Sequence, residues 1–279
     1  MNILDNPALN SWEAQLRLRF GVYEGKSFLS ERHHVGPLVV QKSLYPEGKD
    51  VCQVLIIHPP GGIAGGDQLD MEFSVESGAR AQLTTPGAAK WYCAFGRTAK
   101  QMIQIQVAAG AVAEWLPQEN IIFDGADVDS QFVVDCEKQG VFCGWEFTTL
   151  GREAGDEPFL SGRLSQRIEL RLNSYPVFGE RAVITPEVLN HDKALLNSYR
   201  SFGAMYLIGL SKNSVTQEIV KALSSEHEEV GITWIDEVLI ARWVGTHVEE
   251  GRAILAQVWS ALRQQYFGRP AQTPRIWNT

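Results

Sequence analysis

An internal repeat of strand-forming segments constrains the fold of this chain more than any other feature. The segment VESGARAQL, which begins at Val75, aligns with VAAGAVAEW, which begins at Val107, so that Gly78 matches Gly110. A weaker third copy, GVFCGW, begins at Gly140. Strand repeats of roughly 30 residues are typical of stacked sheets or β-solenoid rungs, because each unit buries its face on the next. The alternative is that such glycine hairpins recur by chance.

Alternation of apolar and polar residues predicts further strands on both sides of the repeat. These expected strands cover 14–22, 27–35, 38–44, 51–58, 69–75, 80–84, 101–107 and 165–172. The segment FGER at 178–181 is expected to form the turn of a hairpin. The fold class is therefore mainly β, with residues 1–185 forming a β-rich, solenoid-like body of stacked strands.

The character of the chain changes at Pro186, where helical patterns begin to alternate with apolar strands. Thr185 and Pro186 suit the N-cap and first position of a helix, and Gly268 suits the end of one. The expected helices cover 186–197, 215–227 and 248–267, and the expected strands between them cover 204–210 and 237–244. This order predicts a small α/β layer, residues 186–279, packed on the β body as one structural unit.

Charge and composition exclude several functional classes. The chain of 279 residues carries a net charge of −8 and has no Lys/Arg cluster, which argues against a nucleic-acid partner. No apolar stretch is long enough to span a bilayer, and the N-terminus lacks the features of a signal peptide. The four cysteines are scattered, without a C-x-x-C pair, as expected of reduced thiols. We therefore expect a cytoplasmic protein without a membrane partner.

A glycine-rich loop at 58–67, HPPGGIAGGD, is the most distinctive local motif. It matches neither a P-loop nor a dinucleotide-binding fingerprint, because the required spacing is absent and a strand pattern follows it. Glycine pairs permit tight turns or the close approach of a backbone, ligand or ion. The loop is therefore either a structural turn or a ligand-contacting loop with Asp67 at its rim.

Side chains with catalytic potential are mostly carboxylates. The six histidines have no metal-ligand spacing, and no nucleophile elbow is present. Acids beside glycines in expected loops are Asp67, Glu119, Asp124, Glu153, Glu157 and Glu180. Such acids commonly just solvate turns. They would also suit a β-solenoid carbohydrate lyase or hydrolase that uses loop carboxylates, or weak and exchangeable cation binding. The residues alone leave these alternatives open.

Several motifs, in order along the chain, resemble the UreD (UreH) family of urease accessory proteins. They are HPPGGIAGGD at 58–67, TTPGAAK at 84–90, EWLPQE at 114–119, FDGA at 123–126, GREA at 151–154 and the Gly162-Arg163 pair. Two departures from the family pattern concern the detail rather than the resemblance. The family often has Gly-Arg-x-Ala-x-Gly-Glu, but here Asp156 stands directly before Glu157 and the glycine, Gly155, lies one place earlier. After the lysine that matches Lys90, the family commonly has an aromatic and then a basic residue, but here Tyr92 is followed by Cys93.

The resemblance implies a non-enzymatic chaperone or scaffold without catalytic residues. Members act with UreF and the GTPase UreG to insert nickel into apo-urease, and they are dimeric in that complex through UreF. The resemblance further implies a water-filled nickel passage, with nickel in transit and no permanently bound cofactor. Weak oxygen ligands suit such a passage, because the cation must leave as well as enter.

The resemblance also assigns expected roles to individual positions. It implies Asp67 and Glu180 as transient nickel contacts. Further motif or interface candidates are His58, Thr85, Lys90, Glu119, Asp124, Arg152 and Glu157.

Overall fold

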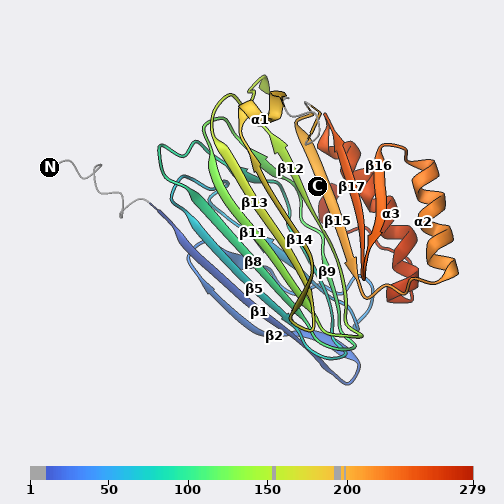
Figure 1. The fold of residues 1–279 in the computed structure, drawn as a ribbon. Helices are drawn as coiled ribbons and strands as arrows, with labels where there is room; N and C mark the ends of the chain where they lie inside the picture. The colour runs from blue at the N-terminus through green and yellow to red at the C-terminus, as the bar shows by residue number, and fades with distance from the viewer. Residues whose placement is uncertain (1–10, 153–154, 192–195, 198, 279) are drawn as a thin grey trace.

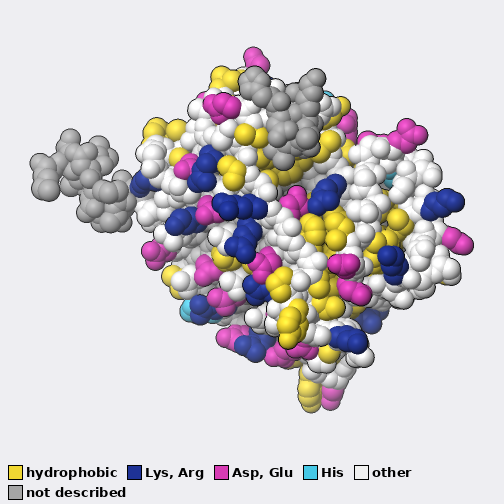
Figure 2. Space-filling model, in the orientation of Figure 1, with side chains coloured by type: hydrophobic (Ala, Val, Ile, Leu, Met, Phe, Trp, Pro, Cys, Tyr) yellow, Lys and Arg dark blue, Asp and Glu magenta, His cyan; other side chains and the backbone are white. Residues whose placement is uncertain are grey.

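Two β-sheets face each other and form the body of the protein (Figure 1). The structure is a computed structural model that describes residues 11–152, 155–191, 196–197 and 199–278. The seven-stranded sheet contains, in spatial order, β14 (Tyr175–Ile184), β13 (Arg163–Leu172), β11 (Asp127–Cys136), β8 (Ala99–Val107), β5 (Gln68–Val75), β1 (Glu13–Tyr23) and β2 (Lys26–Val35). Its outer face carries interspersed acidic and basic side chains (Figure 2).

The opposite sheet has ten strands and includes the C-terminal ones. Its main path runs through β16 (Val230–Ile235), β17 (Val238–Gly245), β15 (Ser201–Ile208), β12 (Val141–Leu150), β9 (Val112–Trp115), β6 (Arg80–Thr84), β4 (Cys52–Ile57) and β3 (Val39–Val40). The short strands β10 (Asn120–Ile122) and β7 (Ala89–Trp91) branch from β12. Because the chain crosses repeatedly from one sheet to the other, neighbouring strands in the middle of each sheet are parallel.

The strand register confirms the solenoid repeat. Gln68 of β5 lies opposite Lys100 of β8, and Arg80 of β6 lies opposite Val112 of β9, so both pairs keep the offset of the sequence repeat. A third rung is also present, because Val112 pairs with Val141 of β12, but the pairing is one residue out of the sequence alignment and the left-handed turn residue is Gln139 and not Gly140. At the tight turns the chain adopts the left-handed conformation, with φ of 76° at Gly78 and 73° at Gly110. The repeat is therefore the rung of a β-solenoid.

Two sequence-based expectations in the body are wrong. The strand expected at 38–44 is limited to Val39–Val40. Residues 178–181 do not form a turn but lie inside β14, and the chain reverses at Asn173 and Ser174, which have φ of 49° and 65°. The carboxylate of Asp135 accepts hydrogen bonds from the N–H and hydroxyl of Ser174 and holds this turn. Gly179 lies within this strand, where an added methyl group would have no neighbour within 4 Å.

The C-terminal residues form the α/β layer expected from the sequence. The strands β15, β17 and β16 extend the ten-stranded sheet, since β15 pairs with β12. The helical elements are α1 (Pro186–His191), α2 (Ser214–Glu226), α3 (Val248–Phe267) and a short 3₁₀ turn (Arg275–Asn278). Asn213 and Thr216 form the capping box that begins α2, and Gly268 ends α3 in a left-handed conformation. Residues 192–195 of the helix expected at 186–197 lie outside the described residues.

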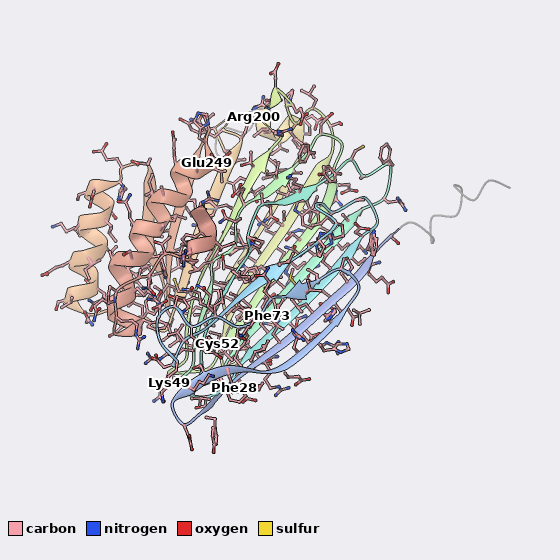
Figure 3. All side chains as sticks on the ribbon, turned by 180° about the vertical axis from the view of Figure 1, so that it is seen from behind. Phe28, Lys49, Cys52, Phe73, Arg200 and Glu249 are labelled. Atoms are coloured by element: carbon pink, nitrogen blue, oxygen red, sulfur yellow. The ribbon has the colours of Figure 1, made fainter. Side chains whose placement is uncertain are left out.

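Two hydrophobic layers hold these elements together, one between the sheets and one between the ten-stranded sheet and the helices. Strand β12 contributes to both: Phe142 points between the sheets, while Trp145 and Phe147 point toward α3. Seen from behind, α2 and α3 lie on one side of the ten-stranded sheet, while Phe73 belongs to the layer between the sheets (Figure 3).

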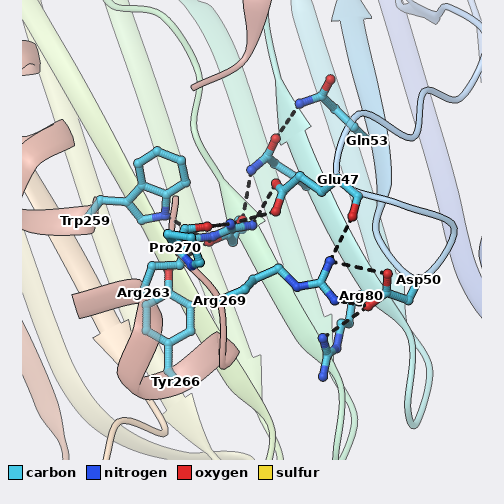
Figure 4. A network of polar contacts seen from close by, with 11 residues as sticks. Glu47, Asp50, Gln53, Arg80, Trp259, Arg263, Tyr266, Arg269 and Pro270 are labelled. Atoms are coloured by element: carbon cyan, nitrogen blue, oxygen red, sulfur yellow. Dashed lines mark hydrogen bonds and ion pairs between the residues drawn. The ribbon is translucent and has the colours of Figure 1, made fainter. Parts of the chain in front are cut away.

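A buried ionic network fastens α3 to the solenoid (Figure 4). The fully buried carboxylate of Glu114 accepts hydrogen bonds from Arg263 at 2.9 and 3.0 Å and from the Trp259 indole at 2.8 Å. Arg263 is equally buried and also donates to the carboxylate of Glu47 at 2.7 and 2.8 Å. Gln82, one rung away, donates to Glu114 at 2.9 Å. Nearly water-free charges therefore join α3 to the ten-stranded sheet.

We expect Arg263→Met to lower the free energy of unfolding by about 3–5 kcal/mol, because it leaves buried carboxylates without their cation. Urea unfolding measures the loss. Arg17→Met is the matched control, since Arg17 pairs with Glu72 where both side chains are about half exposed, at 52% and 43%. That variant should lose less than about 0.5 kcal/mol. Equal losses in the two variants would contradict a dominant role for the buried network.

Candidate functional site

A cavity of about 210 Å³ lies between the two sheets, at the end of the rungs where the long loops stack. Its wall is mostly apolar and includes Met71, Ile103 and Trp115. Polar side chains that line it are His58, Thr85, Lys90, Gln101, Gln118, Asn120 and Glu146. The cavity therefore combines three candidate residues named from the motifs with Gln101, Asn120 and Glu146, which lie outside the motifs.

Stacked loops build the wall of the cavity that lies between the sheets. Ile63 of the glycine-rich loop bridges to Trp91 of β7, Lys90 of β7 pairs with Ile121 of β10, and β10 pairs with β12. These short parallel pairings continue the solenoid through the loops. The exposed residues Pro86 and Gly87 of the loop after β6 and the exposed Lys90 of β7 border the cavity and form its mouth.

Close packing explains the glycines of the loop at 58–67. A side chain at Gly62 would meet the ring of Tyr92 at 2.0 Å, and one at Gly65 would meet the carbonyl oxygen of Ala94 at 2.1 Å. Both contacts are with the next rung. Gly61 and Gly62 also line the cavity. The loop is therefore a packed turn that also forms part of the cavity wall, and its contact with a ligand stays a prediction.

We expect Gly65→Ala to destabilise the protein by about 1–3 kcal/mol, because the added methyl group collides with the backbone of the next rung. Gly87→Ala is the control, since a methyl group there has no neighbour within 4 Å. That change should be neutral or slightly stabilising. Thermal and urea unfolding of the two variants compare them, and equal stability would contradict the close approach at Gly65.

Glu146 is the most unusual side chain in the cavity. It lies on β12 with 6% of its surface exposed, and it points between the sheets toward the cavity. Its carboxylate accepts a hydrogen bond from the Trp115 indole at 2.6 Å and another from the Asn120 amide at 3.2 Å. Burial raises the pKa of Glu146 to about 7, although these two donors act to lower it. The protein thus keeps a poorly solvated acid inside its core.

His58 is the second unusual group. Its Nε2 atom is buried and has no hydrogen-bond partner within the described part of the chain. Burial lowers the pKa of the imidazole, and the nearby carboxylate of Asp67 opposes this shift. His58 therefore lines the cavity as a buried imidazole whose Nε2 atom is enclosed by protein atoms.

Glu146→Gln should stabilise the fold at pH 8 by about 3 kcal/mol and leave it nearly unchanged near pH 4. Between the ordinary pKa of 4.5 and the raised value of about 7, the folded protein holds a proton that the unfolded chain has lost. The free energy of unfolding of the natural protein therefore falls as the pH rises through this window. The amide does not titrate. Urea unfolding at both pH values measures the gain, and a gain independent of pH would contradict the assignment.

Asp67 has a clear structural use. Both oxygens of its carboxylate accept backbone N–H groups at 2.8 Å, one from Trp12 and one from Ala64. The residue is 1% exposed and does not line the cavity. Asp67 therefore ties the glycine-rich loop to the segment before β1. Its expected role as a nickel contact stays a prediction.

Glu180 lies on β14, where the edges of the two sheets meet. Its carboxylate accepts a hydrogen bond from Arg242 of β17 at 2.6 Å, and the buried Tyr206 of β15 interacts with it as well. Burial raises the pKa of the Tyr206 hydroxyl, and the carboxylates of Glu180 and Glu146 add to the effect. Tyr206 therefore interacts electrostatically with both Glu146 and Glu180. The nickel contact expected at Glu180 also stays a prediction.

The other candidate acids are dispersed over the loops. Glu119 pairs with Arg252 of α3 at 2.7 Å, Asp124 accepts N–H groups of Leu160 and Ser161, and Glu157 lies 4.0 Å from Arg152. Glu153 lies outside the described residues. No group of three or more His, Cys, Asp or Glu side chains able to hold a metal occurs in the described ranges. Each of these described acids thus contacts its own partner, and they do not gather into one site. Their arrangement does not favour the carbohydrate-active alternative.

Glu146 and Gln101 were missed by motif reasoning, although the sequence contained a signal for one of them. Within VFCGWEFTTL at 141–150, Glu146 is the single charged residue of a strand that is otherwise apolar or small. A charge in the middle of such a strand is unusual because isolated buried charges are costly. That strand alone does not reveal which sheet face borders a cavity.

These features define a β-solenoid scaffold with a helical layer and a polar-lined internal cavity. No helix in the described part of the chain is long and apolar enough to cross a membrane. The model of the UreD urease accessory protein family matches residues 13–278. The chain therefore belongs to the UreD urease accessory protein family.

Curated relatives agree with this assignment over nearly the whole chain. A urease accessory protein UreD of Methylobacillus flagellatus is 40% identical over 275 residues, covering 96% of this chain and 95% of the relative. One of Dechloromonas aromatica is 39% identical, with coverage of 96% and 95%. One of Nitrosospira multiformis is 39% identical, with coverage of 95% and 97%. The names describe accessory proteins and not enzymes, in agreement with the expected non-enzymatic role.

Proposed function

We propose that this protein is the subunit of a urease maturation complex through which nickel passes on its way into apo-urease. Membership of the UreD family supports the role in urease maturation. The partners in this proposal are UreF, the GTPase UreG and apo-urease, with two copies of the complex joined through UreF. The protein would act in the cytoplasm and hold nickel only in transit.

The internal cavity is the observation that carries the passage. It lies between the sheets, with exposed loop residues at its mouth and polar groups along an otherwise apolar wall. A buried water needs only about 10–15 Å³ of such volume, so the space accommodates a cation with several water ligands. A second, smaller hollow shares Asn120 with it and is lined by Ser130, Thr148 and Gln166. Polar side chains therefore continue farther between the sheets.

The ligand chemistry agrees with transit and not storage. Three cysteines are buried, and burial raises the pKa of the Cys136 thiol to about 12, so it stays protonated and is a poor metal ligand. The cavity wall instead offers one carboxylate, amide groups and one imidazole. A cation held by few protein ligands keeps part of its water shell and is released easily. This is the behaviour that a passage requires.

We expect Ala88→Trp to lower urease activation to near the level seen without this chain. Ala88 lines the cavity, so an indole placed there obstructs it. The variant is co-expressed with urease and the other accessory genes, and the nickel content and activity of the purified urease are measured. Pull-down of UreF, UreG and apo-urease checks that the complex still assembles.

Ala109→Trp is the matched control, because Ala109 lies in the tight turn before β9, at the far end of the rungs from the loops. That variant should activate urease like the natural protein. Normal nickel loading by Ala88→Trp, in a complex that assembles fully, would overturn the passage. Full activation of urease without this chain would overturn the maturation role itself.

A further inference from the structure

The most exposed large apolar side chain in the described part of the chain lies on an unfavourable backbone conformation. Phe95, in the loop between β7 and β8, has 86% of its surface exposed and a φ of 47°. The other described non-glycine residues with positive φ are all polar. A bulky side chain is disfavoured in this left-handed region, and such strain gathers at functional sites. The fold therefore holds a phenyl group in water against the preference of its own backbone.

The local turn does not account for this aromatic residue. The N–H of Arg97 donates to the carbonyl oxygen of Ala94 at 3.0 Å, and Gly96 has a φ of 80°. Positive φ at both central residues defines a type I′ turn, which favours Asn-Gly, Asp-Gly or Gly-Gly. An asparagine at Phe95 would therefore suit the turn better, and the phenyl group has to be explained by what it contacts.

Phe95 borders an open groove of about 520 Å³ on the loop surface. Tyr92 and Phe123 also line this groove, and the centroids of their rings lie 5.2 Å apart. Leu160 of the adjacent loop is 69% exposed, and its N–H donates to the carboxylate of Asp124 in the groove wall. The loops lie at the upper end of the strands in Figure 1, the end at which α1 lies. Exposed aromatic and aliphatic side chains gathered in this way are typical of a protein-binding surface.

Two carboxylates set the charge of the groove. Asp124 and Glu157 line it together with one guanidinium group, that of Arg97. Burial acts to raise the pKa of the exposed Asp124, but hydrogen bonds from the loop after β12 hold that pKa below its ordinary value, so the carboxylate is ionised. Glu157 is only loosely paired, at 4.0 Å from Arg152. The groove therefore suits an apolar side chain that has a Lys or Arg beside it.

We propose that this groove is the docking site for apo-urease and that Phe95 is its aromatic anchor. The partner segment is expected to combine an apolar side chain with a basic one. The inference rests on the proposed role in urease maturation, because the family description connects this chain with urease. It does not depend on the nickel passage. Aromatic anchors of this kind commonly carry much of the binding energy of an interface.

The test compares Phe95→Asn with Tyr175→Asn in the full chain, co-expressed with urease and the other accessory genes without nickel. Tyr175 is 77% exposed at the start of β14, at the far end of the rungs. Pull-down of the tagged chain measures the recovery of apo-urease, UreF and UreG, and titration of the purified complex with apo-urease measures the affinity. Phe95→Asn should weaken the binding of apo-urease by about tenfold or more and leave UreF recovery unchanged. Tyr175→Asn should change neither.

Thermal unfolding separates an anchor from a structural residue. Phe95→Asn should raise the midpoint by about 2 °C, because Asn-Gly suits the turn and the exposed phenyl group contributes little packing. Tyr175→Asn should not raise it. A lower midpoint for Phe95→Asn would show that the side chain supports the fold, and this result would overturn the inference.

A charge variant tests the acidic side of the groove. Asp124→Asn keeps the acceptor for the loop N–H groups but removes the charge, so apo-urease binding should weaken about threefold at low salt and depend less on salt. Asp236→Asn is the matched control, because Asp236 is an exposed acid in the hairpin between β16 and β17. The control should bind like the natural protein. Equal salt dependence of the two variants would contradict a basic partner segment.

Unchanged apo-urease binding by Phe95→Asn would overturn the inference. Loss of UreF in place of urease, or loss of self-association of this chain, would assign the groove to another occupant and would overturn it as well. The maturation role stands in these cases if urease activation in the presence of nickel still requires this chain. Full activation without the chain would overturn the proposed function itself.

Discussion

The in-register parallel stacking of the rungs is the constraint on which the rest of this structure depends. Stacking at a nearly constant offset places equivalent residues of successive repeats side by side. On the face toward α3, Gln53 therefore contacts Gln82, and Gln82 donates to Glu114. The row ends at Arg263, which lies on a helix 149 residues later in the chain. Local repetition thus creates the polar anchor that fixes the helical layer.

The same stacking produces the cavity. Loops that follow equivalent strands lie next to each other, so Ile63, Trp91 and Ile122 form neighbouring positions of a short ladder between the sheets. Small residues allow the loops to approach closely, as the contacts at Gly62 and Gly65 show. The space between these loops and the sheets is lined by polar groups such as Gln101 and Glu146 together with large apolar side chains such as Trp115. The cavity is therefore a consequence of the repeat and not an addition to it.

Two fully or largely buried glutamates illustrate how tertiary context decides the chemistry of an acid. Glu114 and Glu146 lie on neighbouring strands of one sheet, but their side chains point to opposite faces. Glu114 meets Arg263 and becomes part of a structural clamp. Glu146 meets only neutral donors, and burial raises its pKa to about 7. The difference lies in what packs on each face, which pairwise strand contacts do not reveal.

The sequence by itself determined many of the strands, the rung length, the helical layer and the family motifs, because all of these arise from local periodicity and spacing. It did not predict β11, β16 or the short strands β7 and β10. The sequence prediction was wrong for the turn after β13. The turn was expected at 178–181, which contains Gly179, but the chain reverses at Asn173 and Ser174, which adopt left-handed conformations. Only the tertiary structure decided which acids are structural and which one borders the cavity. Asp67 and Glu146 could not be ranked from sequence, because burial and hydrogen-bond partners come from residues distant along the chain.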